Sequence, residues 1–423
     1  MMGKTIVEKI LGRAAGGEGL APGDIAVVEI DLTVLIDTDF FPSNWRNVTK
    51  VANPDKVVVV YDHRMPAPDR ETAEAHVAGR SFVRRFGIKR LHDVGRDQGI
   101  SHVVVADNAY ALPGMIMVCE DSHTCSAGAF NCAGRGIGGP DMIYCITTGT
   151  TWFRVGETIR YDLAGRLRAA VSTKDVFLHM AGRFGDHTNQ NLEFGGDGLR
   201  YLGMDARRTL TTMAAELSAE FAIFDPDDVL LDYVRQRNPT AVFEPVYPDA
   251  DAGYKERRSI ALGEIEPMLA LPDAMVNNTI PLREAAGEQI QQAFIGSCAN
   301  GTLDDLAVAA KVVGGRRIAP GVRLIVTPGS ERIHREALKA GYVSALMEAG
   351  AIVTNATCGA CAGGHLGVLG PSETCITSST RNYKGRMGDP SARIFMASTA
   401  TVAASAVTGV ITHPGEFLSE VVA

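Results

Sequence analysis

Short apolar runs alternate with amphipathic stretches over the first third of the chain. The runs Lys56–Tyr61, Ser101–Ala106 and Met115–Cys119 have the length of buried strands, whereas Arg70–Phe86 has the spacing of a helix. Strands that alternate with helices are typical of an α/β fold. We therefore predict α/β architecture for this part of the chain.

Polar side chains follow each of these apolar runs directly. They are Asp62 and His63 after the first run, Asp107 and Asn108 after the second, and Asp121 and His123 after the third. In α/β sheets, ligands bind beyond the carboxyl ends of the strands. These positions are therefore the first candidates for a site.

The rest of the chain divides into two further parts. The middle part is more charged, with a helix predicted over residues 207–222 and a surface loop over Phe243–Tyr254. The last third restarts the α/β pattern with strands at 292–295, 322–326 and 351–354 and helices at 303–313 and 331–340. We predict three domains, 1–156, 157–280 and 281–423, with a site in the cleft between them.

Composition excludes several classes of protein. With 46% hydrophobic and 21% charged residues the chain is an ordinary globular protein, and its net charge of -8 argues against nucleic acid or an anionic membrane as partner. It shows neither an apolar run of 18 residues nor a secretory signal. We expect a cytoplasmic protein.

The eight cysteines are clustered, which indicates reduced thiols for metal or redox use. Cys358 and Cys361 form a CxxC beside two glycines, and this pair fits a redox dithiol, half a zinc site, a cluster ligand pair or two inert thiols. A structural zinc would need a second close pair, which the sequence lacks. Cys298 stands alone at a predicted strand-to-helix turn, and three thiolates could hold a cluster with one iron open for Lewis-acid chemistry.

Two other motifs carry candidate chemistry. In Glu120–Thr124, His123 is flanked by Asp121 and Ser122 and suits acid/base work, as does His63 beside Asp62. The glycines that follow, at 134–139, lack the strand and acidic residue of a dinucleotide site, so we expect close loop packing. The segment 378–386 carries arginines that form either a solvated loop or a carboxylate-binding site.

Four motifs, DSHT with its glycine-rich continuation, GSCAN, TCGAC and RNYKGRMG, resemble the aconitase and isopropylmalate dehydratase superfamily. The resemblance covers nearly the whole chain. It implies the α/β/α architecture of the shorter bacterial and archaeal large subunits, which comprise domains one to three and lack the swivelling fourth domain.

The resemblance also implies a hydro-lyase and its site residues. A 4Fe-4S cluster would bind Cys298, Cys358 and Cys361. The acid/base pairs would be Asp62 with His63, His102 with Asp121, and His123 with Glu216, and substrate would contact Ser122, Arg381 and Arg386. The base in the family is a serine of the fourth domain. Here it would come from a small swivel-domain subunit, and this chain alone would be inactive.

Three positions depart from the family pattern. Ile36, Thr212 and Thr380 stand where the family usually has polar amide or imidazole side chains. We expect retained chemistry on a changed substrate, a hydroxy di- or tricarboxylate such as an alkylmalate, isopropylmalate or a homocitrate-like acid. The alternatives are a cluster-free, degenerate protein with a binding or regulatory role, including RNA binding, and a zinc or redox protein built on the CxxC.

Overall fold

The computed structural model describes residues 3–17, 19–42, 48–285 and 287–418. Its centre is a five-stranded parallel sheet in the order β4-β3-β2-β5-β6. The strands are β2 Leu32–Ile36, β3 Val57–Val60, β4 Arg90–His92, β5 Ile116–Cys119 and β6 Ala133–Gly136. Every residue of β2, β3 and β5 is buried, because a parallel sheet is covered on both faces. The predicted α/β class is confirmed.

Two smaller sheets extend this core. An antiparallel ribbon pairs β1 Ile25–Glu29 with β7 Thr150–Arg154. The middle of the chain forms a four-stranded parallel sheet, β10-β9-β8-β11, from β8 Glu157–Ala164, β9 Gln190–Gly195, β10 Ala222–Phe224 and β11 Glu256–Ala261. The helices of this half are α1 Ile6–Ala14, α2 Arg70–Phe86, α3 Ser101–Asp107, α4 Gly139–Thr148, α5 Thr173–Phe184, α6 Met204–Met213 and α7 Asp228–Arg237.

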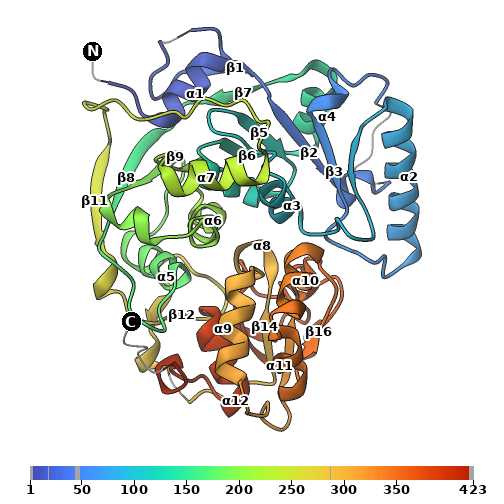
Figure 1. The fold of residues 1–423 in the computed structure, drawn as a ribbon, viewed down its shortest axis with the longest axis vertical. Helices are drawn as coiled ribbons and strands as arrows, with labels where there is room; N and C mark the ends of the chain where they lie inside the picture. The colour runs from blue at the N-terminus through green and yellow to red at the C-terminus, as the bar shows by residue number, and fades with distance from the viewer. Residues whose placement is uncertain (1–2, 18, 43–47, 286, 419–423) are drawn as a thin grey trace.

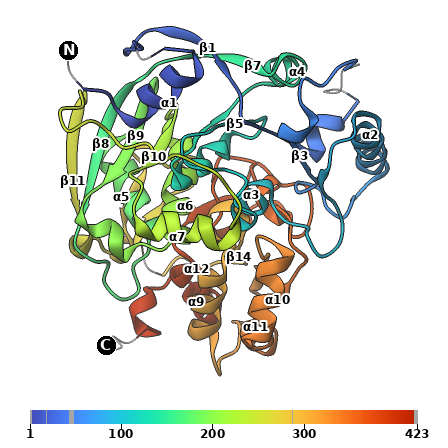
Figure 2. The ribbon, with the colours of Figure 1, turned by 45° about the horizontal axis from the view of Figure 1, so that its top comes forward.

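The last third forms a seven-stranded sheet in the order β13-β12-β18-β17-β14-β15-β16. Its strands are β12 Met268–Ala270, β13 Thr279–Pro281, β14 Gln292–Ile295, β15 Arg323–Val326, β16 Ile352–Val353, β17 Thr374–Thr377 and β18 Arg393–Met396. Its helices are α8 Ser297–Asn300, α9 Leu303–Val313, α10 Glu331–Lys339, α11 Tyr342–Ala349 and α12 Thr399–Thr408. Figures 1 and 2 show α9 to α12, in orange and red, gathered below the blue and green two thirds.

The predicted elements agree with the structure except at two places and in one detail. Ser101–Ala106 is not a strand but lies in α3, and a short helix buried on all sides shows no amphipathic period from which to recognise it. The helix expected over 207–222 ends at Met213, because the chain tightens into a 3-10 turn and Ser218 adopts a left-handed conformation. The glycines at 134–136 lie in strand β6 rather than in a loop, and Gly134 packs against the Thr124 carbonyl.

The domain boundaries stay a prediction. The change from the first sheet and its ribbon to the middle sheet falls between Arg154 and Glu157. Strand β12 lies within the predicted second domain, yet it pairs with β13 and β18 in the last sheet. Within the described residues, no helix combines the length and apolar character needed to cross a bilayer.

The 3-10 segment η3, Ser122–Phe130, packs against β10 with no room for a side chain at Gly128. A Cβ at Gly128 would lie 1.5 Å from the backbone oxygen of Ala222. Gly128→Ala should therefore lower the free energy of unfolding by about 1–3 kcal/mol or more, since neither backbone can yield.

The measurement is thermal or denaturant unfolding of Gly128→Ala beside the control Gly19→Ala, whose Cβ would meet nothing within 4 Å. If both variants unfold like the unmodified chain, the close packing of η3 on β10 is wrong.

Candidate active site

The candidate residues gather where the carboxyl ends of the two large sheets meet. Strand β3 leads into Asp62, β5 into Asp121, β14 into Cys298, and β17 into Thr380. The two halves touch directly, because Cys358 N and Thr357 Oγ1 both donate to the Asp62 carbonyl, at 3.1 and 2.6 Å. Parallel strands place their carboxyl ends at one edge, so each sheet delivers several loops to this point.

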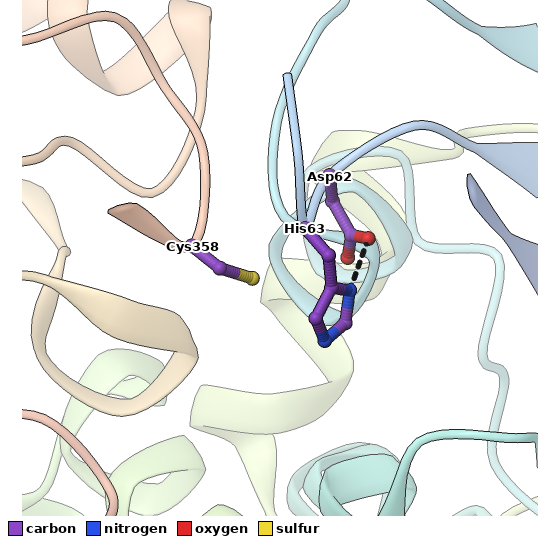
Figure 3. A group of neighbouring side chains, drawn as sticks. All are labelled: Asp62, His63 and Cys358. Atoms are coloured by element: carbon purple, nitrogen blue, oxygen red, sulfur yellow. Dashed lines mark hydrogen bonds and ion pairs between the residues drawn. The ribbon is translucent and has the colours of Figure 1, made fainter. Parts of the chain in front are cut away.

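His63 is held between carboxylates. Its Nδ1 donates to Asp62 Oδ1 at 2.7 Å, and its Nε2 lies 3.3 Å from Asp121 Oδ2. Asp62 Oδ2 accepts from Ser101 N at 2.8 Å, and Asp37 Oδ1 accepts from His63 N at 3.1 Å. Figure 3 shows the His63 ring and the Cys358 thiol pointing into the same space from opposite halves of the molecule.

Asp121 contacts three histidines. Its Oδ1 accepts from His102 Nε2 at 3.1 Å and from the backbone N–H of His123 at 2.7 Å and lies 3.2 Å from His123 Nδ1, while Oδ2 faces His63. The short helix α3 carries His102 to this point. One carboxylate therefore orients three imidazoles, rather than serving one partner only.

A second network joins His123 to the arginine loop. His123 Nε2 donates to Glu216 Oε1 at 2.8 Å, and the same oxygen accepts from Arg381 Nε at 2.7 Å. Tyr383 Oη donates to Glu216 Oε2 at 2.8 Å, and Arg381 Nη2 donates to Ser122 Oγ at 2.5 Å. The 3-10 turn that ends α6 early is what turns Glu216 toward His123.

The electrostatics of these groups follow from burial and from their partners. Burial alone would lower the pKa of His63, but Asp62 and Asp121 raise it well above its ordinary value. Burial would raise the pKa of Asp121, but His102, His123 and His63 hold it well below its usual range. The pKa of Glu216 is lowered by His123 and Arg381 against the effect of burial. The neighbouring carboxylates therefore favour the protonated form of His63.

The three candidate ligand cysteines lie on two loops. Cys298 is in α8, shortly after β14, whereas Cys358 precedes the 3-10 turn Gly359–Ala362 that follows β16 and Cys361 lies within that turn. Cys298 and Cys361 are buried, Cys358 is partly exposed, and all eight cysteines of the chain are free thiols. Burial raises the pKa of Cys298 and of Cys358, whereas Arg386 and Thr380 bring that of Cys361 below its ordinary value despite burial.

The donor set fits a cluster better than a single ion. Among the described residues, one group of three potential metal-ligand side chains has its ligand atoms within 4.8 Å of one another, and it consists of Asp62, His63 and Cys358. The sulfurs of the three candidate cysteines therefore do not converge on a single ion. That trio makes a poor ion site because both oxygens of Asp62 and both ring nitrogens of His63 already have partners. Arg386 Nε is a buried donor without a protein acceptor in the described part of the chain, which suits an anionic group beside Cys361.

The three departures from the family pattern are all buried. Ile36 ends β2, and Thr212 Oγ1 in α6 has no hydrogen-bond partner among the described residues. Thr380 Oγ1 lies 3.6 Å from Cys361 Sγ, so this hydroxyl touches a candidate ligand. Thr380 therefore borders the candidate site, whereas the side chain of Ile36 packs in the apolar core of the first sheet.

Two contributors to the site were missed from the sequence. Asp37 is wholly buried and holds the backbone of His63 and Arg64, with Oδ2 accepting from Arg64 N at 2.8 Å. A polar residue directly after the apolar run 32–36 was a signal for it. Tyr383 lies inside the RNYKGRMG motif, but nothing in the sequence pairs it with Glu216.

The chain is similar to several known proteins. The model of the aconitase family (aconitate hydratase) matches residues 43–409. The 3-isopropylmalate dehydratase large subunit of Mycolicibacterium smegmatis is 50% identical over 99% of both chains. The probable methanogen homoaconitase large subunit of Methanothermobacter thermautotrophicus is 38% identical over 98% of both. The crystal structure of Thermococcus kodakaraensis aconitase X (holo-form) matches 84% of each chain with a TM-score of 0.50 and 10% identity, which shows the fold alone.

Proposed function

The chain belongs to the aconitase family, and on that premise we propose that it adds and removes water on a hydroxy di- or tricarboxylate, with 3-isopropylmalate as the first substrate to test. It is the large subunit of a hydro-lyase, as its full-length similarity to two kinds of hydro-lyase large subunit indicates. The observation that carries the proposal is the meeting of three free cysteines with three histidine–carboxylate pairs at facing strand ends. A cluster-free binding protein would have no use for this complete set.

Cys298, Cys358 and Cys361 are the residues that would hold a 4Fe-4S cluster. When bound, a cluster with one iron free of cysteine supplies a Lewis acid for the substrate hydroxyl. The basic side chains nearest the thiols, Arg386 beside Cys361 and Arg208 beside Cys298, match the negative charge of such a group.

We assign protonation of the departing hydroxyl group to His63. Hydroxide is a poor leaving group, so a proton must reach the oxygen as the carbon–oxygen bond breaks. His63 holds that proton at Nε2, facing Asp121, while Asp62 fixes the ring through Nδ1. In the reverse direction the same nitrogen takes the proton back from water.

Arg381, Arg386 and Ser122 would bind the substrate carboxylates. Glu216 and Ser122 fix the Arg381 guanidinium at Nε and Nη2, which orients the planar group for a carboxylate. Arg386 offers a buried donor of its own.

Catalysis also needs a base for the carbon-bound proton. We propose that a separate small subunit supplies it from a serine, as the full-length similarity to large subunits supports. The large subunit alone, reconstituted with iron and sulfide, should turn over 3-isopropylmalate at background rate. Adding the small subunit should restore activity, followed by the ultraviolet absorbance of the unsaturated product.

A panel of alkylmalates, citrate and homocitrate tests the substrate in the same assay. Activity of this chain without any partner would contradict the split site. Activity of the pair confined to another hydroxy acid would keep the hydro-lyase and replace the substrate.

A further inference from the structure

Lys174, near the start of α5, is a fully buried cation that the proposed chemistry does not use. Its side chain is 0% exposed. Within the described residues no carboxylate oxygen lies within salt-bridge distance of its Nζ. The nitrogen instead donates to the carbonyl oxygens of Ser378 at 3.0 Å and Ser379 at 2.7 Å, and lies 3.4 Å from Met213 Sδ.

The contacts of Lys174 define its charge. All three partners of Nζ are acceptors, so all three contacts need an N–H, and only the ammonium form has three. A neutral amine would turn its lone pair toward one of these acceptors. Burial pulls the pKa of Lys174 down to about 8, and Asp305, Cys298, Cys361 and Glu216 oppose that effect.

A buried ammonium without a paired anion is unfavourable, so a fold that keeps one has a use for its charge. The carbonyls that hold Lys174 belong to the turn after β17, which leads into Thr380 and Arg381. Thr380 in turn touches Cys361. Lys174 therefore lies behind the loop that borders one candidate cluster ligand and carries the proposed substrate arginine.

We propose that Lys174 is a positioning residue whose buried positive charge balances the anionic cluster bound at Cys298 and Cys361. This inference rests on the proposed function, because a cluster held by three thiolates provides the missing negative charge. In the apo chain the ammonium is only weakly compensated. Cluster binding completes the pairing and links the stability of α5 and of the turn after β17 to the cofactor.

Two consequences distinguish this role from simple packing. An apolar replacement of similar shape removes an uncompensated charge from the apo chain but also leaves the carbonyls of Ser378 and Ser379 without their donor, so its two effects on apo stability oppose each other. In the loaded chain the same replacement removes an attraction to the cluster. The replacement should shift the reduction potential of the cluster to more negative values, because a nearby positive charge favours the reduced cluster, which carries more negative charge. It should also speed the loss of the cluster in air.

The experiment compares Lys174→Met with the control Lys311→Met, whose side chain is exposed on α9. The melting temperature is measured for the apo and the anaerobically loaded chain, together with the reduction potential and the rate of bleaching in air. We expect Lys174→Met to gain less in melting temperature from loading than the unmodified chain does, to have a more negative potential and to bleach several-fold faster.

Other outcomes overturn the proposal. Equal destabilisation of apo and loaded chains with an unchanged potential would show a structural role alone. Lys174→Gln, which keeps a donor for the carbonyls without the charge, should behave like Lys174→Met; if neither variant folds as an apo chain, the charge is needed without the cluster and the inference is wrong. Failure of the unmodified chain to take up a cluster would overturn the proposed function instead.

Discussion

Replacing Cys358 by serine should abolish cluster binding and reduce hydro-lyase activity to background. The thiol lies among donors from both halves of the molecule, close to Asp62 and His63, and no other described cysteine is placed to substitute for it. A serine hydroxyl is a far poorer ligand for iron than a thiolate. The broad visible absorbance of the reconstituted chain should disappear.

Cys375→Ser is the matched control, because Cys375 is also a buried free thiol, in strand β17, but forms part of the sheet rather than of the site. This control should keep the spectrum and most of the activity. A Cys358→Ser variant with an unaltered spectrum and iron content would remove Cys358 from the ligand set.

Replacing His63 by asparagine should lower kcat by about 10²–10⁴-fold, the range of a lost general acid. The cluster spectrum should persist, since His63 is not among the proposed ligands. The expected loss follows from the position of the His63 ring between Asp62 and Asp121, two carboxylates that raise its pKa against the effect of burial and so favour a proton on the ring. The KM for 3-isopropylmalate should change much less than kcat.

The control is His334→Asn, a histidine on α10 that lies 3.6 Å from Glu331 and outside the site. It should leave both constants unchanged. Near-normal turnover by His63→Asn, assayed with the small subunit present, would assign the proton transfer to another residue.

Much of the fold was predictable from the apolar pattern. The helix at Arg70–Phe86 and the helix at Leu303–Val313 have the predicted bounds, because both have a periodic apolar face and clear caps, Asp69 and Thr302. The strand predicted at Ser101–Ala106 was wrong, because a helix that is buried on all sides has no polar face that would identify it. The helix over 207–222 was too long because a left-handed Ser218 is not visible in the composition.

The site was predictable only where a motif carried it. The family resemblance, not the spacing of the cysteines, gave the ligand set, which stays a prediction; it also paired His123 with Glu216 across 93 residues of chain, and this contact is present in the structure. Asp37, Tyr383 and Lys174 were missed because their contacts are made by tertiary packing between segments far apart in sequence. Their roles follow from burial and hydrogen bonds, which a single sequence does not contain.

The most direct test of the central claim is the metal content of the unmodified chain after anaerobic reconstitution. Iron, acid-labile sulfide and zinc are measured together with the visible and electron paramagnetic resonance spectra. We expect about four iron and four sulfide per chain, with a broad visible absorbance. Stoichiometric zinc without iron, or a chain that takes up neither, would contradict it.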